Sequence, residues 1–470
     1  MNNDQSSRQK NIPKFIIVSL IGAFLFLGLS TIGGRTDIPL GHAIFWLTGA
    51  LGNVSLGTYA PYGDTGSLGL HYLLALIIIT ISFLGTVVAY LFKPGFIMNN
   101  PKVKDTFYSS PVYFISKAVG FAVVWMIFLG IGPHAVTNSF TGDVMINLTA
   151  SLVVIFIFLA PAIPLLTGFG LMEFLGVLIR RVVRRLFTLP GRASVDLMAS
   201  WFGSSAAAVL ITRDQHERGF YTGREASVIA TNFCFVSLPF TFFIVSFVDL
   251  QSYFLHFYLV MCLTCILLAL LLPRIWPLRS LPDTYLADVG KQIDEDVPAN
   301  TSRFKYAVQL AGERAHQTKA KDVIKSGAYN YLNIFMDLIP IILAWGTVAL
   351  MIHELTDFFD WIALPMGYFL NIFGIEGAFD YAAATLVGFV DMFIPALLLG
   401  SAPYATRFIL GVLSIVQIIY LAETGVLILK SKMPLNFLKL FVIFMMRTLI
   451  GLPIIIFFTW LLGTIGWLPF

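Results

Sequence analysis

Nine stretches of this chain are apolar enough and long enough to cross a lipid bilayer, and this constrains the fold more than any other feature. A spanning helix needs about 20 such residues, because an α-helix rises about 1.5 Å per residue. The stretches lack the alternation of barrel strands, so each predicts a helix. They cover residues 13–33, 67–92, 111–133, 144–166, 224–248, 253–273, 332–353, 405–425 and 436–466.

The composition predicts an all-α polytopic membrane protein with about nine transmembrane helices. Hydrophobic residues make up 57% of the chain and charged residues only 12%, against about a quarter charged in soluble domains. The first apolar stretch has no small-residue cleavage site, so we expect a retained helix rather than a signal peptide. The net charge of +4 is spread over the loops without a basic stripe, so nucleic-acid binding is not predicted.

The loops predict the orientation in the membrane, because Lys and Arg concentrate on the cytoplasmic side. Three basic residues precede the first helix, the loop 34–66 has one Arg, and the loop 93–110 has three Lys. This alternation predicts that the N-terminus lies on the cytoplasmic side. The expected location is a bacterial cytoplasmic (inner) membrane. Five arginines in residues 178–192, "LIRRVVRRLFTLPGR", form an amphipathic segment expected to lie along the inner surface.

Residues 194–212 are long enough to span but contain a Gly-Ser break, "WFGSSAAA". A spanning segment would place Arg213, Arg218 and Arg224 outside, against the distribution of positive charge. A re-entrant hairpin keeps them inside, and its irregular backbone is tolerated where protein or water satisfies it. We therefore predict a re-entrant segment, with an ordinary spanning helix as the alternative.

A weak internal repeat extends this prediction to the second half of the chain. Leu171-Met172 matches Leu350-Met351 at a spacing of 179 residues, and Tyr221 matches Tyr404 and Arg224 matches Arg407 at a spacing of 183. Three spans and one re-entrant hairpin in each half would make the two repeats inverted, a pattern typical of secondary transporters. The expected parts are a three-helix scaffold, a first repeat, a cytoplasmic linker and a second repeat, at residues 1–143, 144–273, 274–331 and 332–470.

Two segments, "GRASVDLMASWFGSS" and "YTGREASVIATNFCFVSLPF", resemble the Gate, or nucleoside-recognition, domain. Concentrative nucleoside transporters, spore maturation proteins and ferrous-iron permeases share this domain. The whole chain resembles a YjiH-type membrane protein of that superfamily, which implies an inverted-repeat core with two opposed hairpins. The Gln-Thr-Glu and Asn-Glu-Phe motifs by which those transporters hold nucleoside do not occur in this sequence, so the resemblance does not fix the solute.

Carboxylates at bilayer depth are the first candidate site residues, because burying one costs about 2.5 to 3.5 kcal/mol. Asp196 and Asp380 occupy equivalent places near the start of each hairpin, where helix capping is the alternative role. Glu225 and Asp391 also lie in apolar surroundings, although Asp391 could instead face an outer vestibule.

Polar residues on two further helices complete the candidate site. Gln417, Tyr420, Glu423 and Thr424 fall on one helical face, with Glu423 as the expected substrate or coupling-ion ligand. The first repeat offers Thr231 and Asn232 in the corresponding helix. Such residues could also merely bond neighbouring helices, which stabilises by about 0.6 kcal/mol on average.

Small polar residues in the hairpins are the last candidates. Ser200, Ser204 and Ser205 lie about one turn apart in the first hairpin, and Thr385 has the comparable place in the second. Close helix packing by small residues is the alternative. The cluster at residues 213–224 could form a gate, but a solvated turn with local salt bridges is the simpler reading.

The sequence favours a transporter over an enzyme. It contains no HExxH or P-loop pattern and no clustered metal ligands, so no catalytic residue, metal or cofactor is predicted. We expect a homo-oligomeric secondary transporter that moves a nucleoside, amino acid or short peptide by alternating access with Na⁺ or H⁺. The alternative is a Gate-domain assembly or signalling protein that does not transport.

Overall fold

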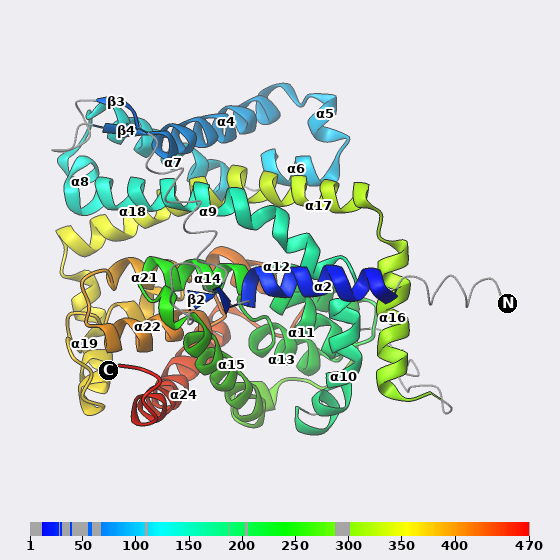
Figure 1. Ribbon diagram of the computed structural model, residues 1–470. Helices are drawn as coiled ribbons and strands as arrows, with labels where there is room; N and C mark the ends of the chain where they lie inside the picture. The colour runs from blue at the N-terminus through cyan, green and yellow to red at the C-terminus, as the bar shows by residue number, and fades with distance from the viewer. Residues whose placement is uncertain are drawn as a thin grey trace. The chain divides into compact units, whose positions relative to one another are not determined.

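Figure 1 shows the computed structural model of the chain, which is predominantly helical as predicted. It describes residues 12–27, 29–30, 38–39, 55–58, 67–108, 111–187, 189–202, 205–286 and 301–469. The chain forms two compact units. Unit 1 comprises residues 1–39, 165–319 and 363–470, and unit 2 comprises residues 40–164 and 320–362.

Four helices in the described part are long and apolar enough to cross a membrane. They run over Leu70–Phe92, Gln251–Arg274, Gly327–Ile352 and Phe437–Thr464. Shorter apolar helices occur at Ile12–Ile21, Tyr113–Leu129, Thr141–Val154, Trp361–Ile372 and Tyr404–Val416. The chain is thus a multi-pass membrane protein, and the expected number of nine spans stays a prediction.

Unit 2 is built around the helices α4, α7 and α18, which pack on one another. Lys117 of α7 is fully buried and forms an ion pair with Asp337 at 2.6 Å. Gly120 of the same helix lets the backbone of Pro340 approach so closely that an added Cβ would lie 2.5 Å from its carbonyl oxygen. The elements of unit 2 are β3 (Ser55–Thr58), β4 (Ser67–Gly69), α4 (Leu70–Phe92), α5 (Gly95–Met98), α6 (Pro101–Phe107), α7 (Pro111–Leu129), α8 (His134–Thr137), η1 (Ser139–Asp143), α9 (Val144–Thr167), α17 (Ala320–Asn333), η5 (Ile334–Leu338) and α18 (Ile339–Leu355).

Unit 1 holds most, but not all, elements of the two predicted repeats, and further elements from residues 1–39 and 274–319. They are α2 (Ile12–Leu27), β1 (Leu29–Ser30), β2 (Ile38–Pro39), α10 (Leu171–Leu186), α11 (Ala193–Phe202), α12 (Ser205–Glu217), α13 (Gly223–Asn232), α14 (Leu238–Phe247), η2 (Gln251–Tyr253), α15 (Phe254–Leu271), η3 (Leu272–Arg274), η4 (Leu278–Ser280), α16 (Arg303–Gln317), α19 (Phe358–Ile372), α20 (Ala384–Val387), α21 (Ile394–Leu398), α22 (Tyr404–Val416), η6 (Leu421–Gly425), α23 (Val426–Leu429) and α24 (Phe437–Thr464). The strands pair antiparallel, β1 with β2 and, in unit 2, β3 with β4.

The amphipathic helix α10 packs on α11 and on the linker helix α16. Val177 and Val183 are buried, whereas Arg181, Arg184 and Arg185 are exposed, as expected for a helix at a membrane surface. Lys14 of α2 joins the same layer, because its ammonium group donates to the carbonyls of Ala315 and Thr318 at 3.0 and 2.8 Å.

Helices α11 and α12 form the predicted helical hairpin. They contain 10 and 13 residues, so at about 1.5 Å per residue neither reaches across a hydrocarbon core about 30 Å thick. The hydroxyl of Thr212 donates to the carboxylate of Asp196 at 3.1 Å. This bond joins the first turns of α11 to the second half of α12, so the two helices run antiparallel.

The second repeat has a shorter hairpin, in which α20 packs on α21. Within unit 1, Figure 1 shows α10 to α13 toward one end and α19, α21 and α22 toward the other. This placement is the one expected if the two hairpins enter from opposite faces.

The windows 224–248 and 405–425 are not continuous helices, contrary to the sequence prediction. The first is interrupted between α13 and α14 at residues 233–237, and the second between α22 and η6 at residues 417–420. The offset of 183 residues that relates Tyr221 to Tyr404 carries the first interruption onto residues 416–420. Each of the two repeats therefore contains a hairpin followed by an interrupted helix.

The inverted arrangement predicts opposite accessibility for the two hairpin bases. Arg218, after α12, and Ser401, after α21, are both exposed. In whole cells, a membrane-impermeant maleimide should leave Arg218→Cys unlabelled and should label Ser401→Cys. The unsubstituted chain is the control, because Cys234 and Cys265 are buried and Cys262 is only half-buried. Labelling of both positions from the same side would contradict the inversion.

Candidate functional site

The first interruption follows the last turn of α13, where Thr231 and Asn232 are fully buried. The Thr231 hydroxyl donates to the carbonyl of Ser227 at 2.7 Å, and the Asn232 amide donates to the Thr231 hydroxyl at 3.0 Å. These donors are satisfied within the helix. The side-chain carbonyl of Asn232 and the backbone carbonyl of Thr231 face Arg447 instead.

The second interruption begins at Gln417 and is strained at the next residue. Ile418 is buried with φ at 62°, a conformation that β-branched residues rarely adopt. Side chains on either side hold this geometry. The hydroxyl of Tyr420 donates to the carbonyls of Ser414 and Ile415 at 2.9 and 2.8 Å.

Thr424 secures the other end of the second interruption. Its hydroxyl donates to the carbonyl of Ile418 at 2.9 Å and accepts from the backbone N–H of Tyr420 at 3.1 Å. Tyr420 and Thr424 are both fully buried and act here on the backbone of their own segment. Of the predicted polar face, Gln417 and Glu423 are thus the members that reach other elements.

Arg447 of α24 joins the two interruptions. Its guanidinium is completely buried. Nε and Nη2 donate to the carbonyl of Val416 at 2.9 and 2.7 Å, at the end of α22. Nη1 donates to the carbonyl of Thr231 at 3.1 Å and to Oδ1 of Asn232 at 2.9 Å, at the end of α13. One cation thus bonds the C-terminal ends of both half-helices, which carry partial negative charge.

The first hairpin contacts both interruptions through two serines. Ser200 of α11 is fully buried and donates to the carbonyl of Phe235 at 2.6 Å. Ser205, the first residue of α12, donates to the Glu423 carboxylate at 2.8 Å. The second half of α11 therefore contacts the first interruption, and the first residue of α12 contacts Glu423 of η6. Ser204 lies outside the described residues.

The second hairpin reaches the second interruption through Gln417. The Gln417 amide donates to the backbone carbonyl of Thr385 at 2.7 Å and to the hydroxyl of Thr448 at 2.8 Å. Its Oε1 is buried and accepts no hydrogen bond from the described residues. Asp391 lies in the hairpin turn, where its carboxylate accepts from the N–H of Phe393 at 2.8 Å.

Three predicted carboxylates lie outside this centre. Glu225 forms a capping box with Thr222 at the start of α13, with bonds of 2.9 and 3.2 Å. Asp196 is 3% exposed and closes the base of the first hairpin through Thr212. Asp380 is exposed, because α20 begins four residues later and leaves it in the preceding turns. Asp196 and Asp380 are therefore not equivalent in the fold.

The charge cluster after the first hairpin pairs within its own helix. Arg213 bonds Glu217 and Arg218 bonds Asp214, each at 2.9 Å and four residues apart. The hydrogen bond from Arg213 lowers the pKa of Glu217. Exposed pairs of this kind contribute little, as expected for a solvated turn.

Arg447 is the site residue that the sequence analysis missed. A signal existed, because it stands alone among apolar residues in "FVIFMMRTLIGLPIII", and a charge at that depth requires partners. Among the described residues no group of three or more His, Cys, Asp or Glu is placed to hold a metal. The centre instead presents hydroxyl groups, an amide, backbone carbonyls and Glu423, which suit a polar solute or a proton.

A glycine next to Gln417 provides a test of this geometry. A Cβ at Gly388 would lie 2.0 Å from Oε1 of Gln417, so Gly388→Ala must displace the amide and break its bonds. We expect a lower melting temperature, corresponding to about 1–3 kcal/mol of overpacking, in thermal unfolding of the purified protein. Gly400→Ala is the matched control, because its nearest neighbour would lie 3.9 Å away. Equal melting temperatures for the two variants would show that Gln417 is not held as described.

Comparison with known proteins finds a matching family model, a similar solved structure and a similar protein sequence. A model of the Gate family, described as nucleoside recognition, matches residues 149–251. A solved structure of a CNTnw variant in an outward-facing state is 16% identical, with a TM-score of 0.39, and covers 83% of this chain and 98% of that one. An uncharacterized protein of Alkalihalophilus pseudofirmus is 38% identical over 457 residues, which is 97% of this chain and 95% of that protein. The chain therefore belongs to the same family as the Alkalihalophilus protein.

Proposed function

We propose that this protein is a secondary transporter of the bacterial cytoplasmic membrane, which moves a small polar organic solute by alternating access. The observation that carries the proposal is the pair of interrupted helices, α13–α14 and α22–η6, each preceded by a helical hairpin in its repeat. Broken helices at corresponding positions of two repeats are the usual framework of a midplane transport site. A purely structural membrane protein gains nothing from two such breaks.

The polar groups around the breaks support a polar solute. Ser205 and Glu423 bring a hydroxyl and a carboxylate together at 2.8 Å, and Gln417 keeps a buried acceptor beside the second hairpin. A nucleoside, an amino acid or a short peptide offers matching donors. The description of the Gate family as nucleoside recognition favours nucleosides among these.

A cation gradient would supply the energy, and Glu423 is the proposed coupling group. Its carboxylate accepts a hydrogen bond from Ser205 at the start of α12, so a change in its charge acts directly on the contact between the first hairpin and the second repeat. Protonation, or binding of Na⁺, would neutralise the carboxylate and loosen or remake this contact.

The solute can be identified by ligand stabilisation. A solute that binds the folded protein must raise its melting temperature by mass action, by about 2.7 kcal/mol of stability at a hundredfold excess over Kd. The purified protein should be screened against nucleosides, amino acids and dipeptides. Hits are then tested for gradient-dependent uptake into proteoliposomes. If no solute on the panel is bound or accumulated, the protein is better regarded as a Gate-domain assembly or signalling protein.

Glu423→Gln should abolish accumulation of the solute while the protein stays folded. The substitution keeps the shape, and the Gln amide oxygen can still accept from Ser205, but the side chain can no longer take up a proton or carry a negative charge to bind Na⁺. The measurement is uptake of the labelled solute into proteoliposomes, with the melting temperature recorded in parallel. Glu376→Gln is the control, because Glu376 lies exposed on a turn. Full uptake by Glu423→Gln would remove this residue from the coupling step.

A further inference from the structure

The buried guanidinium of Arg447 has no role in the transport cycle proposed above, yet it is completely enclosed. Four of its hydrogen bonds go to oxygen atoms at the ends of α13 and α22. No carboxylate among the described residues forms an ion pair with it. Its charge is therefore balanced by helix ends and not by an acidic side chain.

The charge balance is close to complete. The C-terminal end of a helix carries about half a negative charge, so two such ends together offset about one positive charge. Both half-helices stop inside the protein, where their last carbonyls have no helical partners. Each end also contributes an oxygen at 2.7 to 3.1 Å from a guanidinium nitrogen. The junction is therefore an oxygen-lined cation site that is already full.

We propose that Arg447 is a built-in cation, which permanently fills the place where a transporter with two interrupted helices would hold a coupling Na⁺. In such transporters the free carbonyls and half-helix ends coordinate the coupling cation. Here the equivalent oxygens bind a charge that is covalently attached to α24 and cannot leave. This inference rests on the proposed function and narrows it: the protein binds no Na⁺ at the helix breaks, and Glu423 couples transport to protons.

The first test needs no identified solute. The melting temperature of the purified protein is measured while NaCl replaces choline chloride at constant ionic strength. For the wild type we expect the same melting temperature throughout. A saturable rise that is specific for Na⁺ would overturn the proposal, because a bound coupling ion must stabilise the folded state.

Variants of Arg447 provide the second test. Arg447→Ala removes the charge and opens the oxygen-lined junction, so its lowered melting temperature should rise by several degrees with added Na⁺ or guanidinium, but not with choline. Arg447→Lys keeps a tethered cation and should show no such response. If Arg447→Ala responds to these cations no more than to choline, the junction is not a cation site. Should Arg447→Ala not fold, the melting temperatures of wild type and Arg447→Lys are compared in NaCl and in choline chloride. A rise specific for Na⁺ in either protein would overturn the proposal.

The outcome is separable from that of the proposed function. Absence of any bound or accumulated solute would count against transport, whatever the cation response. Uptake that occurs but stops when choline replaces Na⁺ would keep the transporter and overturn the role of Arg447.

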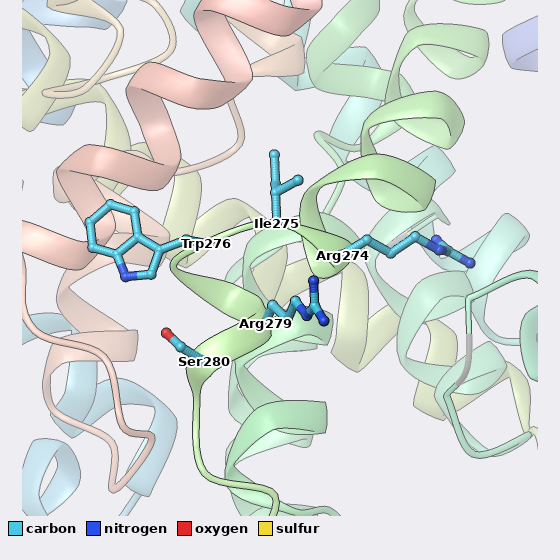
Figure 2. A pocket seen from close by; sticks show the side chains of 5 residues that line it. All are labelled: Arg274, Ile275, Trp276, Arg279 and Ser280. Carbon is cyan, nitrogen blue, oxygen red and sulfur yellow. The ribbon is translucent and has the colours of Figure 1, made fainter.

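A second inference comes from a different place, the turn that follows α15. Arg274, Ile275, Trp276, Arg279 and Ser280 line a cavity of about 490 Å³ there. Figure 2 shows the side chains of Arg274 and Arg279 on one side of this turn and Trp276 on the other. The turn directly follows a candidate membrane span, Gln251–Arg274.

The residues of the cavity suit the head group of a membrane lipid. Arg274 is held in place, because its Nη2 donates to the carbonyl of Leu186 at the end of α10 at 2.9 Å. Arg279 is exposed and makes no side-chain hydrogen bond or ion pair with the described residues. Trp276 is 63% exposed, a typical position for tryptophan at a membrane interface. The arginine-rich helix α10 therefore meets the end of a spanning helix at a cationic cavity beside an interfacial tryptophan.

The geometry points to a binding site for the phosphate of an anionic phospholipid in this cavity. Basic pockets at the ends of spanning helices are suited to such head groups. Phosphate oxygens would accept hydrogen bonds from Arg279 and from the Ser280 hydroxyl, while Trp276 packs against the glycerol region.

Nanodiscs of defined lipid provide the test. Phosphatidylglycerol added to phosphatidylcholine should raise the melting temperature of the wild type by several degrees, and Arg279→Ala should lose most of this rise. Arg303→Ala is the matched control, because Arg303 is exposed but lies outside the cavity. An equal rise in Arg279→Ala and wild type would overturn the site. Inorganic phosphate that stabilises the protein in phosphatidylcholine to the same extent would assign the cavity to a free phosphate instead.

Discussion

The structure of unit 1 depends on how two helix ends are satisfied far from water. An interrupted helix leaves carbonyl groups without partners, and each such group costs several kcal/mol in an apolar environment. Arg447 bonds the ends of both half-helices, at Thr231 and Val416. Thr231 and Val416, which are 185 residues apart in the sequence, are thereby joined through one side chain of a third helix.

The remaining contacts make the two repeats unequal. At the first hairpin, Ser205 meets the Glu423 carboxylate. At the second, the corresponding contact between hairpin and broken helix is aromatic, because Phe393 stacks on Phe243 with centroids 5.0 Å apart. The offset that relates the repeats places Phe240 opposite Glu423 in the alignment. The contact between Ser205 and Glu423 therefore includes a titratable side chain, whereas the contact between Phe393 and Phe243 does not.

The sequence predicted the helical class, the first hairpin and the repeat, because apolar length, positive charge and a Gly-Ser break are local features. It did not predict the helix breaks, since residues 233–236, "FCFV", are as apolar as any helix and the break is set by contacts with Ser200 and Arg447. The pattern also equated Asp380 with Asp196. They differ in burial because the second hairpin has the shorter helices, which a match of single residues does not reveal.

The strain at the second break explains why a solute or proton would act there. Ile418 has φ at 62°, at a cost of about 1–3 kcal/mol that surrounding bonds must outweigh. Those bonds come from Gln417, Tyr420 and Thr424, while Glu423 ties the same segment to the first hairpin. The hydrogen bond of Glu423 is similar in energy to the strain at Ile418. A ligand that changes the charge or the hydrogen bonds of Glu423 can therefore alter the balance between this strain and the bonds that hold it. The first break, residues 233–237, has no residue in the left-handed region and no carboxylate, so the second break is the part of the site whose geometry a ligand can shift.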